Sequence, residues 1–262
     1  MGALAFKETT TAISVRHRGK GTKMPESKIN VVLVHGAWAE CASWSEIIPA
    51  LQKEGLEAIC APLPLTTLGD DVSALDRLWA RLTGDIILVG HAYAGAVIGA
   101  ARHERVKSLV YVAGLAPDEK ETVADVFYRE ALHPQAPKLA PDSDGFIWMP
   151  PEGFANAFAQ NAAPDVKSML FATQRPINVK CIQETSPRPL WKEKPSWFLV
   201  AEQDRMIPAK TQYFQAKRMG ATVRAHAVDH SPMLTAPGVV VDIVLEAIRT
   251  NCKDAHSSYQ EK

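Results

Sequence analysis

The chain has 262 residues, of which 47% are hydrophobic, so it is long and apolar enough for one large α/β domain with a sizeable core. Its 29 basic side chains balance 29 acidic ones, which removes the usual electrostatic basis for binding nucleic acid or an anionic membrane. No apolar run approaches the ~20 residues that span a bilayer, and residues 1–28 lack the apolar segment of a secretory signal. We expect a cytoplasmic monomer or homodimer with tails at residues 1–28 and 251–262.

Apolar strands and helical stretches alternate along the chain. Ile29–Val34 is a buried-type strand, and residues 43–54 read as a helix, with Ser43 and Glu46 as a capping box and Gly55 as its end. Further strands are expected at 56–61, 85–89, 106–113, 197–201 and 221–228, and further helices at 70–83, 96–101, 208–219 and 238–250. This alternation predicts an α/β fold with a doubly wound, mostly parallel sheet.

The pattern changes between residues 117 and 194, where prolines are frequent and we expect no buried strand. Helical pieces are expected near 123–132, 151–161 and 165–172. We interpret 117–194 as a helical lid inserted into a core of residues 29–116 and 195–250. Its aromatic and methionine side chains either contact an apolar substrate or attach the lid to the core.

The four cysteines, Cys41, Cys60, Cys181 and Cys252, are far apart and form no CxxC pair. This spacing supports neither a zinc site nor a disulfide framework. We therefore expect reduced thiols and no metal.

The segment Gly90-His91-Ala92-Tyr93-Ala94-Gly95 follows the predicted strand 85–89 and precedes a small-residue helix. A strained strand-to-helix turn of the form Gly-x-Ser-x-Gly presents a nucleophile at the start of a helix. Here the small residues and the context are present, and only the serine is missing. The glycine spacing does not match the Gly-x-Gly-x-x-Gly of a dinucleotide site.

Two later residues complete the pattern of a serine hydrolase. Asp204 follows the strand 197–201, and His230 follows the last strand. Alone, Asp204 could be a helix cap and His230 a loop histidine. Together they reproduce the chain order nucleophile, acid, histidine. For the oxyanion hole we expect the backbone N–H groups of Tyr93 and Ala37, with Gly36 allowing a close approach.

Residues 32–38 (VLVHGAW), 88–95 (LVGHAYAG) and 229–234 (DHSPML) resemble the α/β-hydrolase superfamily. They are most similar to its small esterases, a branch that includes plant methyl esterases and hydroxynitrile lyases. The resemblance covers about residues 28–250 and is weakest in the lid. It implies an ester hydrolase without a cofactor, with the triad at positions 92, 204 and 230. Similar lyases carry threonine and lysine where this chain has Gly36 and Ser231, so cyanohydrin cleavage is not expected.

Ala92 has neither a nucleophile nor an exchangeable proton, so we expect this chain to bind an ester and not to form an acyl-enzyme. Either serine was replaced to hold an uncleaved substrate, or the chain is a natural non-catalytic binding protein. The intact Asp204 and His230 favour the replacement. A lactonase or xenobiotic-ester hydrolase would share these residues.

A small, largely apolar ester is the expected partner. The candidate substrate contacts are side chains near the turn or in the lid, although Trp38 could equally pack its own loop: Trp38, His91, Phe146, Trp148, Phe158 and Met233.

Overall fold

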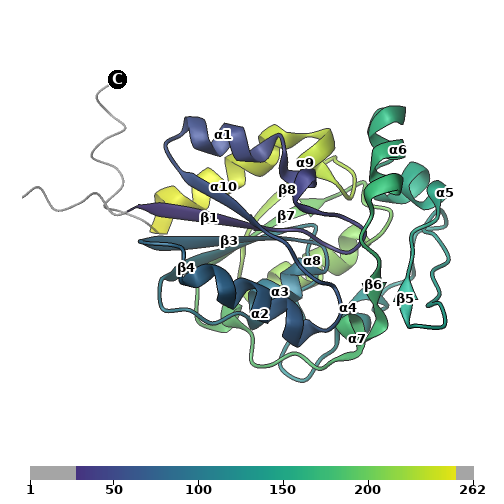
Figure 1. Cartoon of the computed structure of the whole chain (residues 1–262), viewed down its shortest axis with the longest axis horizontal. Helices are drawn as coiled ribbons and strands as arrows, with labels where there is room; N and C mark the ends of the chain where they lie inside the picture. Colours follow the sequence, from purple (N-terminus) through teal and green to yellow (C-terminus); the bar gives the residue numbers. More distant parts are fainter. Residues whose placement is uncertain (1–27, 252–262) are drawn as a thin grey trace, which may run out of the picture.

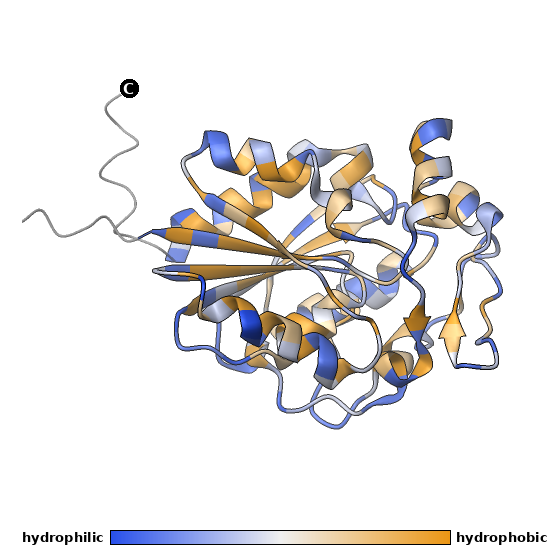
Figure 2. Cartoon of the chain, in the orientation of Figure 1, coloured by the Kyte–Doolittle hydropathy of each residue, from blue (hydrophilic) through white to orange (hydrophobic). Residues whose placement is uncertain are grey.

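The computed structural model describes residues 28–251, and the expected tails lie outside them apart from one residue each. Six parallel strands form the central sheet in the order β2-β1-β3-β4-β7-β8 (Figure 1). The inner strands are almost continuously apolar because both faces of the sheet are covered (Figure 2). The strands are β1 (Ile29–Val34), β2 (Glu57–Ala61), β3 (Asp85–His91), β4 (Val106–Val112), β7 (Ser196–Ala201) and β8 (Thr222–His226). This confirms the predicted fold class.

Helices cover both faces of the sheet (Figure 1). On one face α1 (Ile47–Lys53) packs beside α10 (Pro237–Asn251). On the other face lie α2 (Leu68–Trp79), α3 (Ala94–Ala100) and α8 (Ala209–Met219). Each layer encloses its own cluster of buried apolar side chains, so the sheet is fixed from both sides.

The helix expected at 43–54 is divided in two, and its capping box is wrong. A 3-10 helix, η1 (Cys41–Trp44), precedes α1, and the Ser43 hydroxyl donates to the Glu40 carbonyl at 2.6 Å. Ser43 therefore stabilises the loop after β1 and does not cap α1. Gly55, with φ 75°, follows α1 as expected.

The insertion, which we define as residues 117–194, lies beside the carboxyl ends of the sheet strands (Figure 1). It contains two short strands, β5 (Phe146–Ile147) and β6 (Ile177–Asn178), paired antiparallel and largely buried. The expectation of no buried strand here is therefore wrong, because a two-residue pair leaves no alternating pattern. The remaining elements are α4 (Val123–Phe127), α5 (Pro151–Gly153), the π-helix η2 (Phe154–Phe158), α6 (Pro164–Thr173), α7 (Val179–Gln183) and η3 (Leu190–Lys192).

The prediction of reduced thiols is wrong for Cys41 and Cys60, which form a disulfide with their Cα atoms 5.6 Å apart. The bond ties η1 to β2 beside the loop that follows β1. Cys181 is a free, buried thiol, and Cys252 lies outside the described residues. Within residues 28–251, no helix has the length and apolar character needed to cross a membrane.

Candidate active site

The turn between β3 and α3 places Ala92 in a left-handed conformation, with φ 49°. Such a conformation costs a non-glycine residue roughly 1–2 kcal/mol, so the surroundings must hold it. The Ala92 N–H donates to the Val112 carbonyl at 3.1 Å, and the Ala92 carbonyl accepts from Leu115 at 2.9 Å and Gly95 at 3.0 Å. A Cβ on Gly95 would lie 2.5 Å from the Leu115 carbonyl oxygen, so only glycine fits there. The geometry is that of a turn that presents residue 92 to the cavity.

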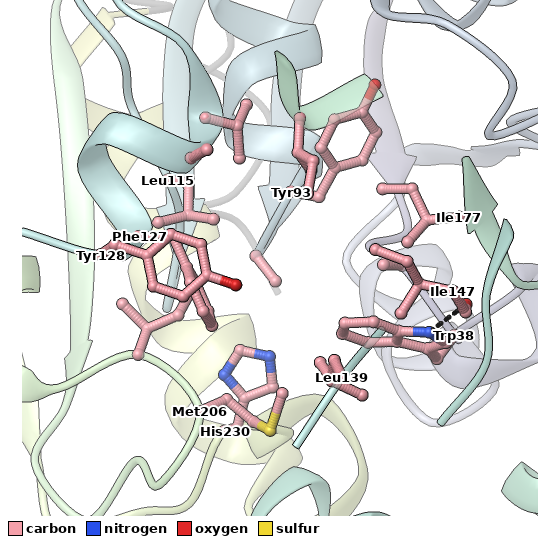
Figure 3. A pocket seen from close by; sticks show the side chains of 16 residues that line it. Trp38, Tyr93, Leu115, Phe127, Tyr128, Leu139, Ile147, Ile177, Met206 and His230 are labelled. Atoms are coloured by element: carbon pink, nitrogen blue, oxygen red, sulfur yellow. Dashed lines mark hydrogen bonds between the residues drawn. The ribbon is translucent and has the colours of Figure 1, made fainter. Parts of the chain in front are cut away.

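His230 and Asp204 form a buried pair that faces this turn. The His230 Nδ1 atom lies 2.8 Å from Asp204 Oδ2, and both side chains are nearly inaccessible to solvent. Asp204 Oδ1 accepts the backbone N–H groups of Met206 and Ile207, and Gln212 donates to Oδ2 at 2.8 Å. Because a carboxylate oxygen accepts hydrogen bonds, Nδ1 is the donor in this contact, and no hydrogen bond within residues 28–251 uses Nε2. The imidazole points into the cavity (Figure 3).

His91 lies directly before Ala92 but behind the His230 ring. Its Nε2 donates to the His230 carbonyl at 2.8 Å, and the two ring centroids are 4.8 Å apart. Complete burial, with His230 beside it, holds the pKa of His91 well below its ordinary value. A neutral His91 therefore anchors the His230 backbone and does not line the cavity.

The loop after β1 lies against the turn, which is the arrangement that an oxyanion hole requires. A Cβ on Gly36 would lie 2.9 Å from the His91 carbonyl oxygen and 3.1 Å from the Ala92 Cβ. Ala37 and Tyr93 line the same cavity. Among the turn and loop hydrogen bonds of residues 28–251, none uses the N–H of Ala37 or Tyr93. Both groups are therefore available to a ligand oxygen.

The cavity in front of Ala92 opens to solvent, and its empty space, including the open part, measures about 660 Å³. Its lining is almost wholly apolar and contains no aspartate, glutamate, lysine or arginine side chain, and His230 contributes a polar ring (Figure 3). The Trp38 indole N–H is occupied by the Ile147 carbonyl at 2.8 Å. Among residues 28–251, no group of three or more potential ligands could hold a metal ion. The lining is Ala37, Trp38, Ala92, Tyr93, Leu115, Val123, Ala124, Phe127, Tyr128, Leu139, Ile147, Ile177, Ile182, Met206, Ile207 and His230.

The structure brings only some of the predicted substrate contacts to this cavity. Trp38 lines it, whereas Phe158 lies behind His230, with 5.2 Å between the ring centroids. Met233 is buried among the side chains of the α1 and α10 layer, and Phe146 does not line the cavity. Trp148 is 53% exposed and donates to Asp142.

Several lining residues were missed by the sequence analysis. Leu115 and Met206 follow β4 and β7, and their positions after strands could have indicated the cavity. Ile177 and Ile182 carry no such signal, because they reach the cavity through the fold of the insertion.

A family model described as "Alpha/beta hydrolase family" matches residues 31–243, and the chain belongs to this family. An alpha/beta hydrolase of Aspergillus novofumigatus (strain IBT 16806), nvfD, is 22% identical over 241 residues, covering 83% of this chain and 95% of that protein.

Among solved structures, a methylesterase from Arabidopsis has a TM-score of 0.70 at 16% identity, with 85% and 99% of the two chains covered. A histidine-to-alanine variant of tomato methylketone synthase I, complexed with beta-ketoheptanoate, has a TM-score of 0.73 at 18% identity, with 85% and 98% covered. These likenesses show a shared fold.

Proposed function

We propose that the form of this protein with serine at position 92 is a carboxylic-ester hydrolase for a small, largely apolar ester. The observation that carries the proposal is the position of Ala92 on a strained turn, in a cavity shared with the free Nε2 edge of His230. The strained turn, the nearby His230–Asp204 pair and the unused N–H groups all suit a serine nucleophile at position 92. Alanine lacks only the Oγ atom of that serine. The proposal also draws on membership of the α/β-hydrolase family.

In the serine form, Oγ attacks the ester carbonyl while His230 Nε2 accepts its proton. The carbonyl electron pair moves to oxygen, which the N–H groups of Ala37 and Tyr93 stabilise. The C–O bond then breaks, and His230 returns its proton to the leaving alcohol. Water repeats the sequence on the acyl-enzyme and releases the acid. Asp204 orients the imidazole and stabilises its protonated form throughout.

The substrate class follows from the lining of the cavity. The cavity lining is apolar on both the Leu115 and the Ile147 sides, and it contains no lysine or arginine side chain. A neutral ester with apolar acyl and alcohol parts matches this surface best. A lactone or a xenobiotic ester would use the same residues, and a substrate panel separates these cases.

With Ala92, the protein binds such an ester and does not turn it over through an acyl-enzyme. The rival proposal is a natural small-molecule binding protein. It predicts a ligand-dependent rise in Tm with no hydrolysis after serine is introduced. Ala92→Ser treated with a fluorophosphonate distinguishes the two by intact mass. The hydrolase proposal predicts one covalent adduct that is lost in Ala92→Ser/His230→Ala, and absence of the adduct supports the rival.

A second candidate function needs no nucleophile and is favoured by Ala92 itself. A β-keto acid loses CO₂ when the bond between its α-carbon and carboxylate breaks and the electron pair forms an enolate. The N–H groups of Ala37 and Tyr93 would stabilise the enolate oxygen, and protonated His230 would supply the proton. The similar tomato methylketone synthase was complexed with beta-ketoheptanoate. Ketone formation from β-ketooctanoate by the Ala92 chain, lost in His230→Ala, tests this candidate.

A further inference from the structure

Asp71 is a fully buried carboxylate that the proposed reaction does not use. Its Oδ1 accepts the Leu65 N–H at 2.8 Å, and its Oδ2 accepts the Tyr93 hydroxyl at 2.7 Å. The Cys181 thiol lies 3.8 Å from the same Oδ2. No lysine, arginine or histidine forms an ion pair with Asp71 in the described part of the chain. A buried charge held only by neutral donors is costly, so its position beside the cavity requires an explanation.

The two hydrogen bonds of Asp71 join Tyr93, in the turn between β3 and α3, to Leu65, which in turn contacts the insertion. Tyr93 follows Ala92, lines the cavity and supplies one of the two available N–H groups. Leu65 is held with φ 59°, and its carbonyl accepts the Asn178 N–H of β6 at 2.9 Å. The neighbouring Ile177 also lines the cavity. Asp71 thus lies on a short path from the insertion to the turn.

We propose that Asp71 is a positioning residue that fixes Tyr93, and through it the backbone N–H that stabilises the oxyanion. The proposal rests on the hydrolase function proposed above. The Tyr93 hydroxyl points away from the cavity (Figure 3) and donates to Asp71. The Tyr93 hydroxyl is held by Asp71, and the Tyr93 carbonyl accepts the Ala96 N–H at 3.0 Å, so both ends of the residue are restrained. Catalysis benefits because a donor that is already oriented needs no reorganisation when charge develops.

The charge of Asp71 gives this arrangement a measurable signature. Burial raises the pKa of Asp71 to about 6, against the opposing effect of the hydrogen bonds from Tyr93 and Leu65. The other titratable groups that face this cluster are Asp70 on α2, and Cys181 and Glu184 at α7. Between pH 5 and 7 the Tyr93 hydroxyl therefore changes from a bond with a neutral acid to a bond with a carboxylate.

The kinetic test uses Ala92→Ser as the reference and p-nitrophenyl butyrate as the substrate. Asp71→Asn and Tyr93→Phe should each lower kcat about tenfold with little change in KM, since the lost effect belongs to the transition state. The double variant should lose no more than either single variant. The matched control is Tyr111→Phe, which removes a buried hydroxyl that has no hydrogen-bond partner and does not line the cavity. Equal kcat in Ala92→Ser and Ala92→Ser/Asp71→Asn would overturn the inference.

A second measurement is independent of hydrolysis. With 3-fluorotyrosine at position 93 in the Ala92 chain, the ¹⁹F resonance should titrate with a midpoint near 6 and should stop doing so in Asp71→Asn. A resonance that does not titrate, or that titrates equally in both proteins, would overturn the link between Asp71 and Tyr93. If Ala92→Ser hydrolyses no ester, the proposed function fails, and the ¹⁹F titration alone decides this inference.

Discussion

The Nδ1 atom of His230 lies 2.8 Å from the Oδ2 atom of Asp204, and both side chains are buried. The same carboxylate accepts the N–H groups of Met206 and Ile207, so the orientation of the imidazole is set by the backbone. The ring is therefore aligned in a protein that has alanine at position 92, where we propose that the active form carries a serine nucleophile. This relationship is the physical basis for treating the site as one side chain short of a serine hydrolase.

Asp204→Asn should lower kcat of Ala92→Ser by about 10⁴-fold, the typical effect of losing the carboxylate of a Ser-His-Asp triad. An asparagine that keeps its oxygen toward the backbone donors presents its NH₂ to His230, which forces the wrong tautomer. Initial rates on p-nitrophenyl butyrate measure the effect, with circular dichroism to confirm folding. A loss of less than tenfold in a folded variant would show that His230 acts without Asp204.

Gly36→Ala should lower kcat/KM of Ala92→Ser about 100-fold. The added Cβ would lie 2.9 Å from the His91 carbonyl oxygen, so the loop that carries Ala37 must move away from the turn. Gly238→Ala is the matched control, because a Cβ there meets nothing within 4 Å. Similar kcat/KM values for both variants would show that the close approach of the Gly36 loop to the turn does not matter for catalysis.

The sheet and the candidate triad could be predicted because their signals are local. Continuous apolar runs indicate strands buried on both faces, and the small residues from Gly90 to Gly95 indicate a tight turn. The order of Asp204 and His230 then indicated a serine-hydrolase type of site, which stays a prediction. Neither the sheet nor the candidate triad required knowledge of which distant residues are in contact.

The disulfide and the cavity lining depend on contacts that a linear pattern does not contain. Cys41 and Cys60 meet because β1 and β2 pair in parallel with η1 between them. Ile147 and Ile177 reach the cavity through the register of β5 and β6. Trp148, which directly follows β5, was a predicted contact, yet its side chain is 53% exposed.

Removing the disulfide should lower the free energy of unfolding by about 3 kcal/mol, because the Cys41–Cys60 bond closes a loop with a sequence separation of 19. For a domain of this size the expected loss in Tm is about 6–12 °C. Cys41→Ser/Cys60→Ser and the Ala92 chain in dithiothreitol should give the same Tm, and dithiothreitol should not affect the variant. A Tm of the Ala92 chain that is insensitive to reductant would count against this bond.

His35 should make stability fall in acid. Its Nδ1 donates to the Gly36 carbonyl, and its Nε2 accepts the Leu63 N–H. Burial lowers the pKa of His35 to about 4. Below the unfolded-state pKa of about 6.5 only the unfolded state binds the proton, so stability present above that pH is lost progressively toward pH 4.

Urea unfolding at pH 7 and pH 4.5 measures this effect as a difference between proteins. The Ala92 chain should lose about 2–3 kcal/mol more than His35→Gln over this interval. The comparison is needed because Asp71, with its raised pKa, acts in the opposite direction: its ionisation destabilises the folded state as the pH rises from about 4 to 6. Equal pH dependence in the two proteins would contradict the account of His35.

The most direct test of the central claim is the rate of p-nitrophenyl butyrate hydrolysis by Ala92→Ser, measured beside the Ala92 chain and Ala92→Ser/His230→Ala. The account predicts that a single oxygen atom at position 92 raises kcat by at least about 10⁴-fold and that loss of His230 abolishes the gain. A folded Ala92→Ser protein that hydrolyses this ester no faster than the Ala92 chain would contradict it.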